Sequence, residues 1–245
     1  MTVAEPGADA TKQAIRERVW RTMVSGRAAR FPGADGRIPN FVGAERAARL
    51  LATVEAWRAS GTLKSNPDAP QLPVRVAALA EGKVVYVAVP RLRDARPFLR
   101  LDPARLAVTP RQAASIRGAG ANGDSATVKQ VRRIDLVVCG TVAVNRDGVR
   151  IGKDGGYSDL EFALLSEAGK VENRTTIATT VHPLQLLDEE LPETPHDFRV
   201  DLIVMPDEII ETGADRSRRP RGIRWEDLDD DRIAAIPALG TRRRP

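Results

Sequence analysis

The 245-residue sequence is poor in the residues that build disulfides and transition-metal sites, with one cysteine and two histidines. A single cysteine, Cys139, excludes an intrachain disulfide, and so few thiol and imidazole groups argue against a tetrahedral zinc site. Any bound metal is therefore expected to be a hard cation held by oxygen.

Long apolar runs are also missing. No segment approaches the roughly 20 apolar residues that a membrane-spanning helix needs. The N-terminal MTVAEPGADATKQ has neither the basic start nor the apolar stretch of a secretory signal. We therefore expect a cytoplasmic protein that has no membrane partner.

Aromatic residues make up only 4% of the chain, whereas basic residues are in excess. The net charge of +5 and the pI near 9.8 point to an anionic partner, such as a nucleotide, another small polyanion or nucleic acid. Much of the excess lies in RSRRPRGIR and the terminal RRR, which have no aromatic stacking platform. We therefore predict that this end is a disordered, solvated tail, and that the partner is a small molecule rather than nucleic acid.

The remaining composition, 42% hydrophobic and 29% charged, is typical of a soluble domain. Residues 1–10 are predicted to be disordered, residues 11–212 to form one domain and residues 213–245 to be a basic extension. Helices are expected from Thr11 as N-cap, over 44–59, in the second half of 67–82 and over 158–169, with Ser158 as N-cap and Glu161 at the capping-box position.

Strands are predicted between these helices, at 62–66, 83–90, 105–110, 135–145, 174–181 and 200–206. Residues 116–134 have too little periodicity to be more than a loop with a helical turn. Because strands alternate with helices, the sequence predicts an α/β fold, a three-layer α/β/α sandwich with a mainly parallel sheet. The sequence leaves the oligomeric state open.

A charged, glycine-rich stretch, RIGKDGGYSD at 150–159, lies between an apolar run and a predicted helix. Glycines in this position let backbone N–H groups turn toward one point, where the helix dipole adds positive charge. The stretch matches neither a Walker loop nor a dinucleotide fingerprint, so it is either an anion-binding loop or a turn that needs positive φ. As an anion site, it would use Arg150 and Lys153 as cations and Asp154 or Asp159 as magnesium ligands.

Several other residues have both a structural and a functional interpretation. Lys12 and Arg16 share one helix face, either as solvated charges or as ligands. Phe41, in a loop with Arg37 and Asn40, either lines a pocket or packs on the sheet. The remaining candidates are Asn66 and Asp68, which also suit turns, and His196 and Asp197, whose adjacent side chains need not act as a pair.

The glycine-rich stretch resembles the signature of the 5-formyltetrahydrofolate cyclo-ligase family, R-x-G-x-G-x-G-Y-Y-D. The residues that match it are Arg150, Gly152, Gly156, Tyr157 and Asp159. The segments KQAIR, GKVVYVAVP, DLVVCGTVAVNRDGVRIG and HDFRVDLIVMPDEII also resemble family segments, in the same order along residues 11–211.

This resemblance implies an ATP- and Mg²⁺-dependent cyclo-ligase with a fold similar to that of ribose-phosphate isomerases and CoA-transferases. In that family the formamide oxygen of the substrate is phosphorylated before the ring closes. The implied catalytic residues are Arg150, Lys153 and Tyr157, and the implied magnesium ligands are Asp159 and Asp154. The implied nucleotide contacts are Lys12, Arg16, Arg150, Gly152, Lys153, Gly155, Gly156, Tyr157 and Asp197.

The chain departs from the family pattern mainly on the substrate side. The family's D-E-x-E-T segment is replaced by SNPDAPQLP, the second tyrosine by Ser158 and one loop glycine by Asp154. We therefore predict a divergent subgroup, with 5-formyltetrahydrofolate as the default substrate. The alternatives are another formamide or amide substrate, or a non-catalytic nucleotide- or nucleic-acid-binding relative. The expected substrate contacts are Phe41, Asn66, Asp68 and Tyr157.

Overall fold

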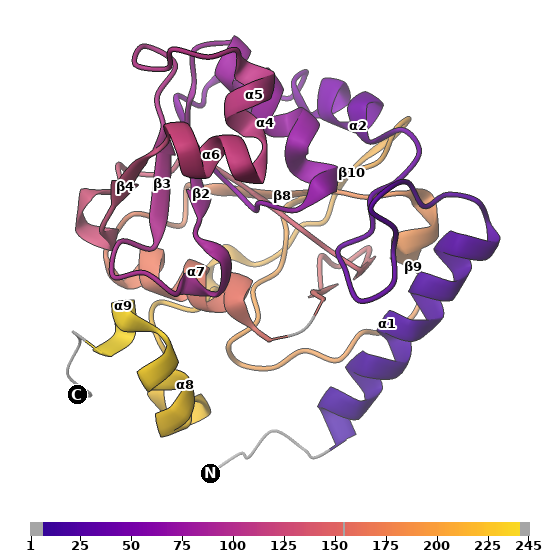
Figure 1. The fold of residues 1–245 in the computed structure, drawn as a ribbon. Helices are drawn as coiled ribbons and strands as arrows, with labels where there is room; N and C mark the ends of the chain where they lie inside the picture. Colours follow the sequence, from indigo (N-terminus) through magenta and orange to yellow (C-terminus); the bar gives the residue numbers. More distant parts are fainter. Residues whose placement is uncertain (1–6, 154, 241–245) are drawn as a thin grey trace.

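An eight-stranded sheet runs through the centre of the computed structural model, which describes residues 7–153 and 155–240 (Figure 1). The strands, in spatial order, are β11 (Ile209–Glu211), β10 (Leu202–Val204), β8 (Thr176–Thr180), β5 (Leu136–Cys139), β1 (Thr62–Ser65), β2 (Val84–Ala88), β3 (Phe98–Leu101) and β4 (Asp124–Ala126). The five strands from β10 to β2 pair in parallel, and antiparallel strands lie at both edges. The predicted mainly parallel sheet is confirmed.

Both faces of this sheet are buried. Along β5, Leu136 and Val138 join one apolar cluster, whereas Val137 and Cys139 join the other. A strand that is covered on both sides consists of apolar residues without polar alternation, because successive side chains point to opposite faces. The alternation of β5 between two cores confirms the three-layer arrangement, and Cys139 is a core residue.

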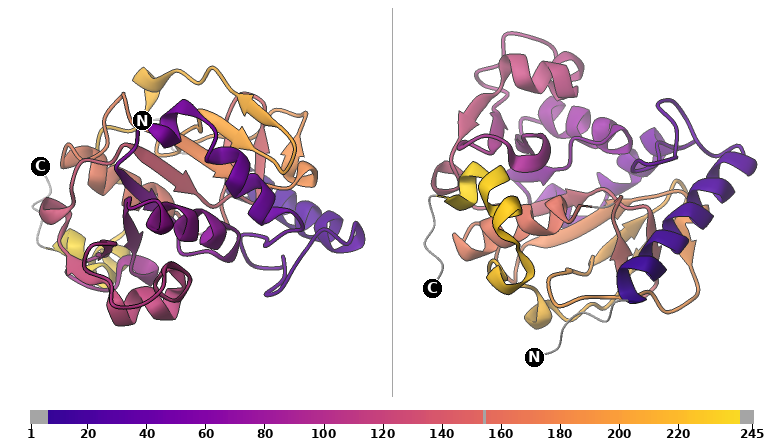
Figure 2. Two further views of the ribbon diagram at one scale, coloured as in Figure 1. Left: turned by 90° about the horizontal axis from the view of Figure 1, so that it is seen from above. Right: turned by 60° about the horizontal axis from the view of Figure 1, so that its bottom comes forward.

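Helices cover the two faces unequally (Figures 1 and 2). One core contains residues of α1 (Gly7–Ser25), α2 (Ala44–Leu51), α3 (Glu55–Arg58), α4 (Leu72–Ala80), α5 (Pro110–Ala114) and α6 (Ile116–Asn122). The other contains residues of α7 (Tyr157–Glu167) and α9 (Pro237–Gly240), with α8 (Asp230–Ala235) at its margin. A second, three-stranded sheet consists of β7 (Arg150–Ile151), β6 (Ala143–Asn145) and β9 (Leu186–Leu187). No helix of the described residues has the length and apolar character to cross a membrane.

Helix ends differ from the predictions at three places. The first helix begins at Gly7 rather than Thr11, with Asp9 in its first turn, so residues 7–10 are helical and not disordered. Residues 1–6 lie outside the described part of the chain. The predicted helix over 44–59 is divided into α2 and α3, because Val54 takes an extended conformation. The N-cap of α7 is Gly156, not Ser158, and it makes no side-chain capping bond.

The region between β3 and β5 was also predicted wrongly. Residues 105–110 do not form a strand, since Thr109 instead caps α5 and exchanges side-chain and backbone hydrogen bonds with Gln112. Residues 116–122 form α6. The sequence did not predict this helix because its alanines and glycines give no apolar periodicity. The predicted strand over 135–145 is two strands, β5 and β6, in different sheets.

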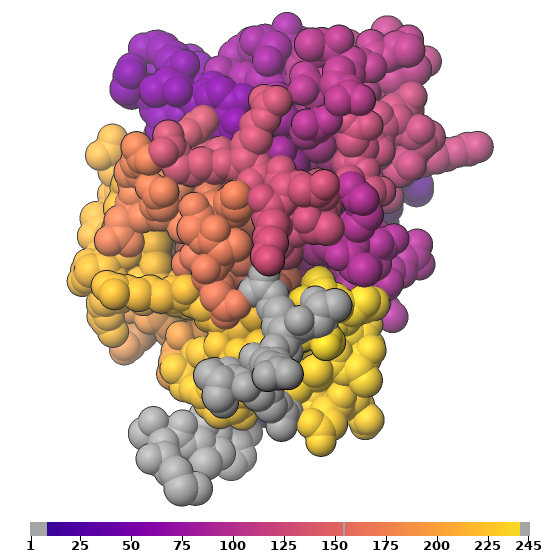
Figure 3. Space-filling view, turned by 90° about the vertical axis from the view of Figure 1, so that its left-hand side faces the viewer, coloured from indigo at the N-terminus to yellow at the C-terminus, as the bar shows by residue number. Residues whose placement is uncertain are grey.

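The described part of the C-terminal extension, residues 213–240, which we call the C-terminal segment, is folded onto the domain. It contains three-residue 3₁₀ turns at Arg216–Arg218 and Trp225–Asp227, followed by α8 and α9. Ile236 and Leu239 are buried in the core that contains α7. The prediction of a disordered tail is therefore wrong for this segment, because apolar residues are spaced between its charges. Figure 3 shows the C-terminal segment, in yellow, packed against neighbouring parts of the chain.

Candidate active site

A cavity of about 1220 Å³ lies beyond the carboxyl ends of β1 and β5. Its walls come from α1, the loop after β1, residues 150–153, 155–161 and 163, residues 196–197 and the C-terminal segment. In open parallel sheets this edge is the usual place for ligands, because the loops that follow neighbouring strands meet there. Among the predicted site residues, the cavity brings together Lys12, Arg16, Asn66, Asp68, Arg150, Gly152, Lys153, Gly155, Gly156, Tyr157, Asp159 and Asp197.

The glycine loop, residues 152–156, forms the wall at the N-terminus of α7; its Asp154 lies outside the described residues. Gly155 and Gly156 have φ values of +80° and +57°, which side chains other than glycine rarely adopt. A Cβ on Gly155 would lie 3.0 Å from the Tyr157 ring. The first amides of a helix have no partner within it, so this end can receive an anion.

Lys12 and Arg16 lie beside this loop, not on a solvated face. Their exposed fractions are 6% and 8%. The Lys12 ammonium is 2.6 Å from a carboxylate oxygen of Asp197, and Arg16 Nε donates to the Gly152 carbonyl oxygen at 2.8 Å. Helix α1 is therefore attached to the glycine loop and to the chain before β10 through its two cations.

The carboxyl of Asp197 is a stable anion in this arrangement. Burial alone would raise its pKa, but the Lys12 ammonium and hydrogen bonds from Lys12 and Thr194 outweigh burial and lower it. The neighbouring His196 also lines the cavity, with Nδ1 3.0 Å from Asp227 and Nε2 3.0 Å from the Thr194 hydroxyl. Both ring nitrogens are therefore engaged, and His196 links the cavity to the C-terminal segment.

Arg150 and Asp159 form a buried pair at the inner end of the loop. Arg150 Nη2 is 2.5 Å from Asp159 Oδ1, and the guanidinium lies 4.2 Å from the centroid of the Phe198 ring. Burial opposes the charge of Arg150, but Asp159 and other acidic neighbours raise its pKa. Burial raises the pKa of Asp159, Arg150 opposes this effect, and Asp197 adds to it. Asp159 is thus a carboxyl that a further cation would stabilise in its charged form.

The described residues contain no group of three or more histidine, cysteine or carboxylate side chains that could hold a metal on its own. Mg²⁺ differs from other metals in this respect, because it commonly binds through one or two carboxylates together with substrate phosphates. Asp159 lines the cavity and suits that role beside a polyphosphate. Asp154, the other predicted ligand, lies outside the described residues.

The loop after β1 faces the glycine loop across the cavity. Asp68 forms a 3.0 Å ion pair with Lys153, and Asn66 Nδ2 is 3.5 Å from the Ser158 hydroxyl. The loop is held from behind by Arg75, which donates to the carbonyl oxygens of Asn66, Pro67, Asp68 and Ala114. Burial lowers the pKa of Arg75 to about 10, so it still carries its charge at neutral pH.

Sequence reasoning missed Arg75 and a second buried pair, Lys64 with Glu161. Their charged groups are 2.5 Å apart, and Lys64 also donates to Asn66 at 3.0 Å. Glu161 lines the cavity, and burial raises its pKa although Lys64 opposes the shift. The available signal was a lysine inside a strand that is buried along its whole length, since such a charge needs a partner.

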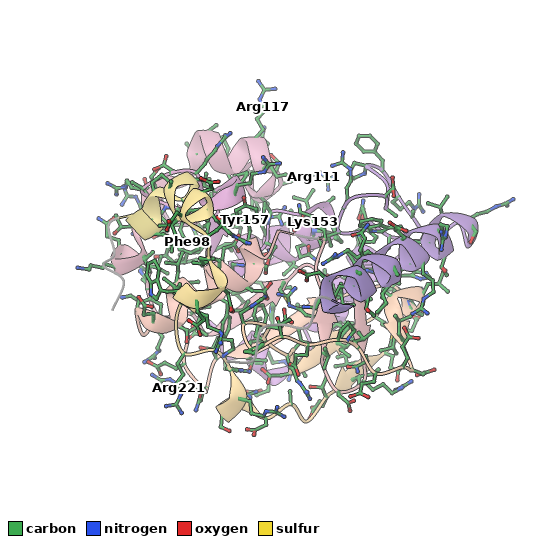
Figure 4. The ribbon with its side chains drawn as sticks, turned by 90° about the horizontal axis from the view of Figure 1, so that it is seen from below. Phe98, Arg111, Arg117, Lys153, Tyr157 and Arg221 are labelled. Atoms are coloured by element: carbon green, nitrogen blue, oxygen red, sulfur yellow. The ribbon has the colours of Figure 1, made fainter. Side chains whose placement is uncertain are left out.

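Phe41 does not line the cavity, so its predicted substrate contact is wrong. Its side chain is 1% exposed, in the core that also contains residues of α1, α2 and α4, and its ring meets His182 edge to face. A large apolar ring gains more from this core than from a polar cleft. Its loop neighbours Arg37 and Asn40 do line the cavity, and Tyr157 reaches it from α7. Figure 4 labels Lys153 and Tyr157, which both lie near the middle of the molecule when it is seen from below.

The chain is similar to known proteins over most of its length. A model of the 5-formyltetrahydrofolate cyclo-ligase family matches residues 8–206. The methenyltetrahydrofolate synthase domain-containing proteins of Bos taurus and Mus musculus are each 38% identical, over 98% and 95% of this chain, and the Homo sapiens protein is 36% identical over 95%. The chain spans 63% of the length of the bovine and mouse proteins.

A solved structure shares the fold. The NMR structure of the 5,10-methenyltetrahydrofolate synthetase of Aquifex aeolicus matches with a TM-score of 0.54 at 18% identity. The match covers 83% of this chain and 94% of that one. At this identity the likeness concerns the arrangement of strands and helices and not the chemistry of individual side chains.

Proposed function

The chain belongs to the 5-formyltetrahydrofolate cyclo-ligase family, and from this premise we propose that it is an ATP- and Mg²⁺-dependent cyclo-ligase that converts 5-formyltetrahydrofolate to 5,10-methenyltetrahydrofolate. The observation that carries the proposal is the meeting of three buried cations and a helix N-terminus at one cavity. The three cations are Lys12, Arg16 and Arg150. Such an arrangement suits a triphosphate, whose charges need fixed donors and an unpaired helix end.

The chemistry explains why a phosphate site is needed. A formamide oxygen is a poor leaving group, so a neighbouring amine cannot close a ring on the formyl carbon unaided. ATP supplies the phosphoryl group that turns this oxygen into a leaving group. The new C–N bond then forms, the C–O bond breaks, the oxygen departs with phosphate and the amine gives up its proton.

In this proposal the chain contributes positioning and charge. Arg150 and the glycine-loop amides would bind the phosphates, Arg16 and Lys12 would hold the nucleotide from α1, and Asp159 would hold Mg²⁺, which would neutralise phosphate charge. Tyr157, Asn66 and Asp68, which line the same cavity, would contact the second substrate. A cavity of about 1220 Å³ is larger than most single-ligand pockets and has room for both reactants.

Three of the cations that line the cavity already have carboxylate partners: Lys12 with Asp197, Arg150 with Asp159 and Lys153 with Asp68. Phosphate binding would therefore compete with these pairs. An exchange in which Arg150 turns toward phosphate while Asp159 turns toward Mg²⁺ keeps every charge paired. This exchange would make nucleotide and metal binding depend on each other.

The test is turnover with MgATP and 5-formyltetrahydrofolate, followed by the absorbance rise of the methenyl product. The expected results are product formation by the wild type, its loss in Arg16→Met and its retention in Arg21→Met, which changes an exposed arginine on the same helix. ATP turnover with another formamide, but not with this folate, would show that the proposed substrate is wrong and that the other formamide is the substrate. No nucleotide-dependent rise in thermal stability would refute the proposal, because a ligand that binds the native state stabilises it.

A further inference from the structure

The C-terminal segment is anchored at both of its ends. Near its start, the buried guanidinium of Arg219 contacts both carboxylate oxygens of Asp201, at 2.7 and 2.6 Å, and donates to the Thr175 carbonyl at 2.7 Å. Near its end, Ile236 and Leu239 are 1% and 0% exposed. Between these anchors, one wall of the cavity is formed by Pro220, Gly222, Ile223, Arg224, Asp227, Leu228 and Arg232. The family model ends at residue 206, before this wall begins.

One residue of this wall touches the glycine loop directly. Arg232, on α8, donates from Nη2 to the carbonyl oxygen of Gly155, and its guanidinium lies 5.6 Å from the centroid of the Tyr157 ring. A Cβ on Gly156 would lie 3.0 Å from the same Nη2 atom. Arg232 therefore reaches the loop in this way because Gly156 has no side chain.

Peptide geometry links this contact to anion binding. The carbonyl of Gly155 and the N–H of Gly156 belong to one trans peptide and point in opposite directions. Because Arg232 holds the oxygen toward α8, the N–H is turned away from α8, and it has no acceptor among the described residues. Without this contact the peptide between two glycines can rotate readily, and a carbonyl oxygen turned toward a phosphate would repel it.

We propose that the C-terminal segment is part of the active site and that Arg232 is a positioning residue, which holds the peptide between Gly155 and Gly156 in the orientation that binds phosphate. The inference deepens the proposed function and rests on it, because it assigns the segment a role in nucleotide affinity. Stacking of Arg232 against Tyr157 extends the same control to the first residue of α7.

The experiment measures MgATP binding by titration calorimetry in Arg232→Met and Arg221→Met. Arg221 is the matched control, since it is an exposed arginine of the same segment and points outward in Figure 4. We expect the Kd of Arg232→Met to rise about tenfold, the size of one lost charge-assisted hydrogen bond, and the control to bind as the wild type does. Equal affinity in the two variants would overturn the inference.

A second measurement needs no ligand. Hydrogen exchange in the first turn of α7, where the Leu160 N–H donates to the Gly156 carbonyl oxygen, should be faster in Arg232→Met than in Arg221→Met, while the core strands stay equally protected. If Arg232→Met also lowers the melting temperature, Arg232→Lys is measured as well, because lysine keeps a charged donor. Wild-type MgATP affinity in Arg232→Lys would support the inference. A loss of affinity equal to that of Arg232→Met would contradict it. A wild type that binds no MgATP would instead refute the proposed function.

Discussion

The two walls of the cavity are built by different means. On the α1 side, Lys12 and Arg16 meet the chain around the glycine loop through short, buried polar contacts. On the C-terminal side, exposed and half-buried residues are suspended between two buried anchors, and contact with the loop depends on Arg232. The first wall resembles a preorganised core, whereas the second is a surface segment with buried anchors at its ends and half-buried or exposed contacts between them, such as that of Asp227 with His196.

This difference has a thermodynamic meaning. Removing a group from the first wall leaves a buried charge without its partner, which costs several kcal/mol. Removing a group from the middle of the second wall leaves its former partner exposed to water, which costs little in the free energy of folding. Substitutions in the first wall should therefore change both stability and activity, whereas those at Arg232 should act mainly on ligand binding.

The largest effect is expected for Arg150→Met. The change removes a cation from the phosphate site and leaves Asp159 buried beside Asp197 without its partner. We expect turnover to fall by about 10³-fold and the free energy of unfolding to fall by about 3 kcal/mol, measured by steady-state kinetics and urea unfolding. Restored turnover in Arg150→Lys would show that charge alone, and not the planar guanidinium over Phe198, is required.

Arg219→Met should sharpen the comparison, because it breaks a buried ion pair at the anchor of the second wall. We expect a loss of about 3 kcal/mol in the free energy of unfolding. MgATP affinity should fall no further than in Arg232→Met, since the only effect on the loop is through the C-terminal segment. Arg218→Met, at an exposed arginine next to the anchor, is the control. A loss of affinity as large as that of Arg150→Met would mean that the two walls are not distinct.

The first wall could be predicted from the sequence because its signals are local. Glycines between a strand and a helix, and two cations four residues apart on a helix, are visible in short stretches. The central sheet was predictable for the same reason, since each buried strand is a continuous apolar run. Lys12 and Arg16 line the cavity, whereas the nucleotide contact that the family resemblance implies for them stays a prediction.

The second wall could not be predicted, because its decisive contacts join residues far apart in the chain. Arg232 meets Gly155 across 77 residues, and Arg219 meets Asp201 across 18. In isolation the segment is rich in arginine, which favours the interpretation as a solvated tail. The prediction for Phe41 failed for a related reason: its ring is buried in the core and meets His182, which is distant in the sequence, and nothing in its own loop shows this.

The smallest effect in this set concerns pH and belongs to the first wall. Because the pKa of Asp197 is lowered in the folded protein, its pairing with Lys12 stabilises the fold fully above the unfolded pKa of about 3.9, and this stability is lost as the pH falls through the lower, folded value. The difference in unfolding free energy between the wild type and Asp197→Asn should therefore stay constant from pH 7 to about 5 and shrink below about 4, as measured by urea unfolding at each pH. Burial opposes the pairing, so a difference that grew on acidification would mean that burial outweighs the pairing and that Lys12 does not hold Asp197 as an anion.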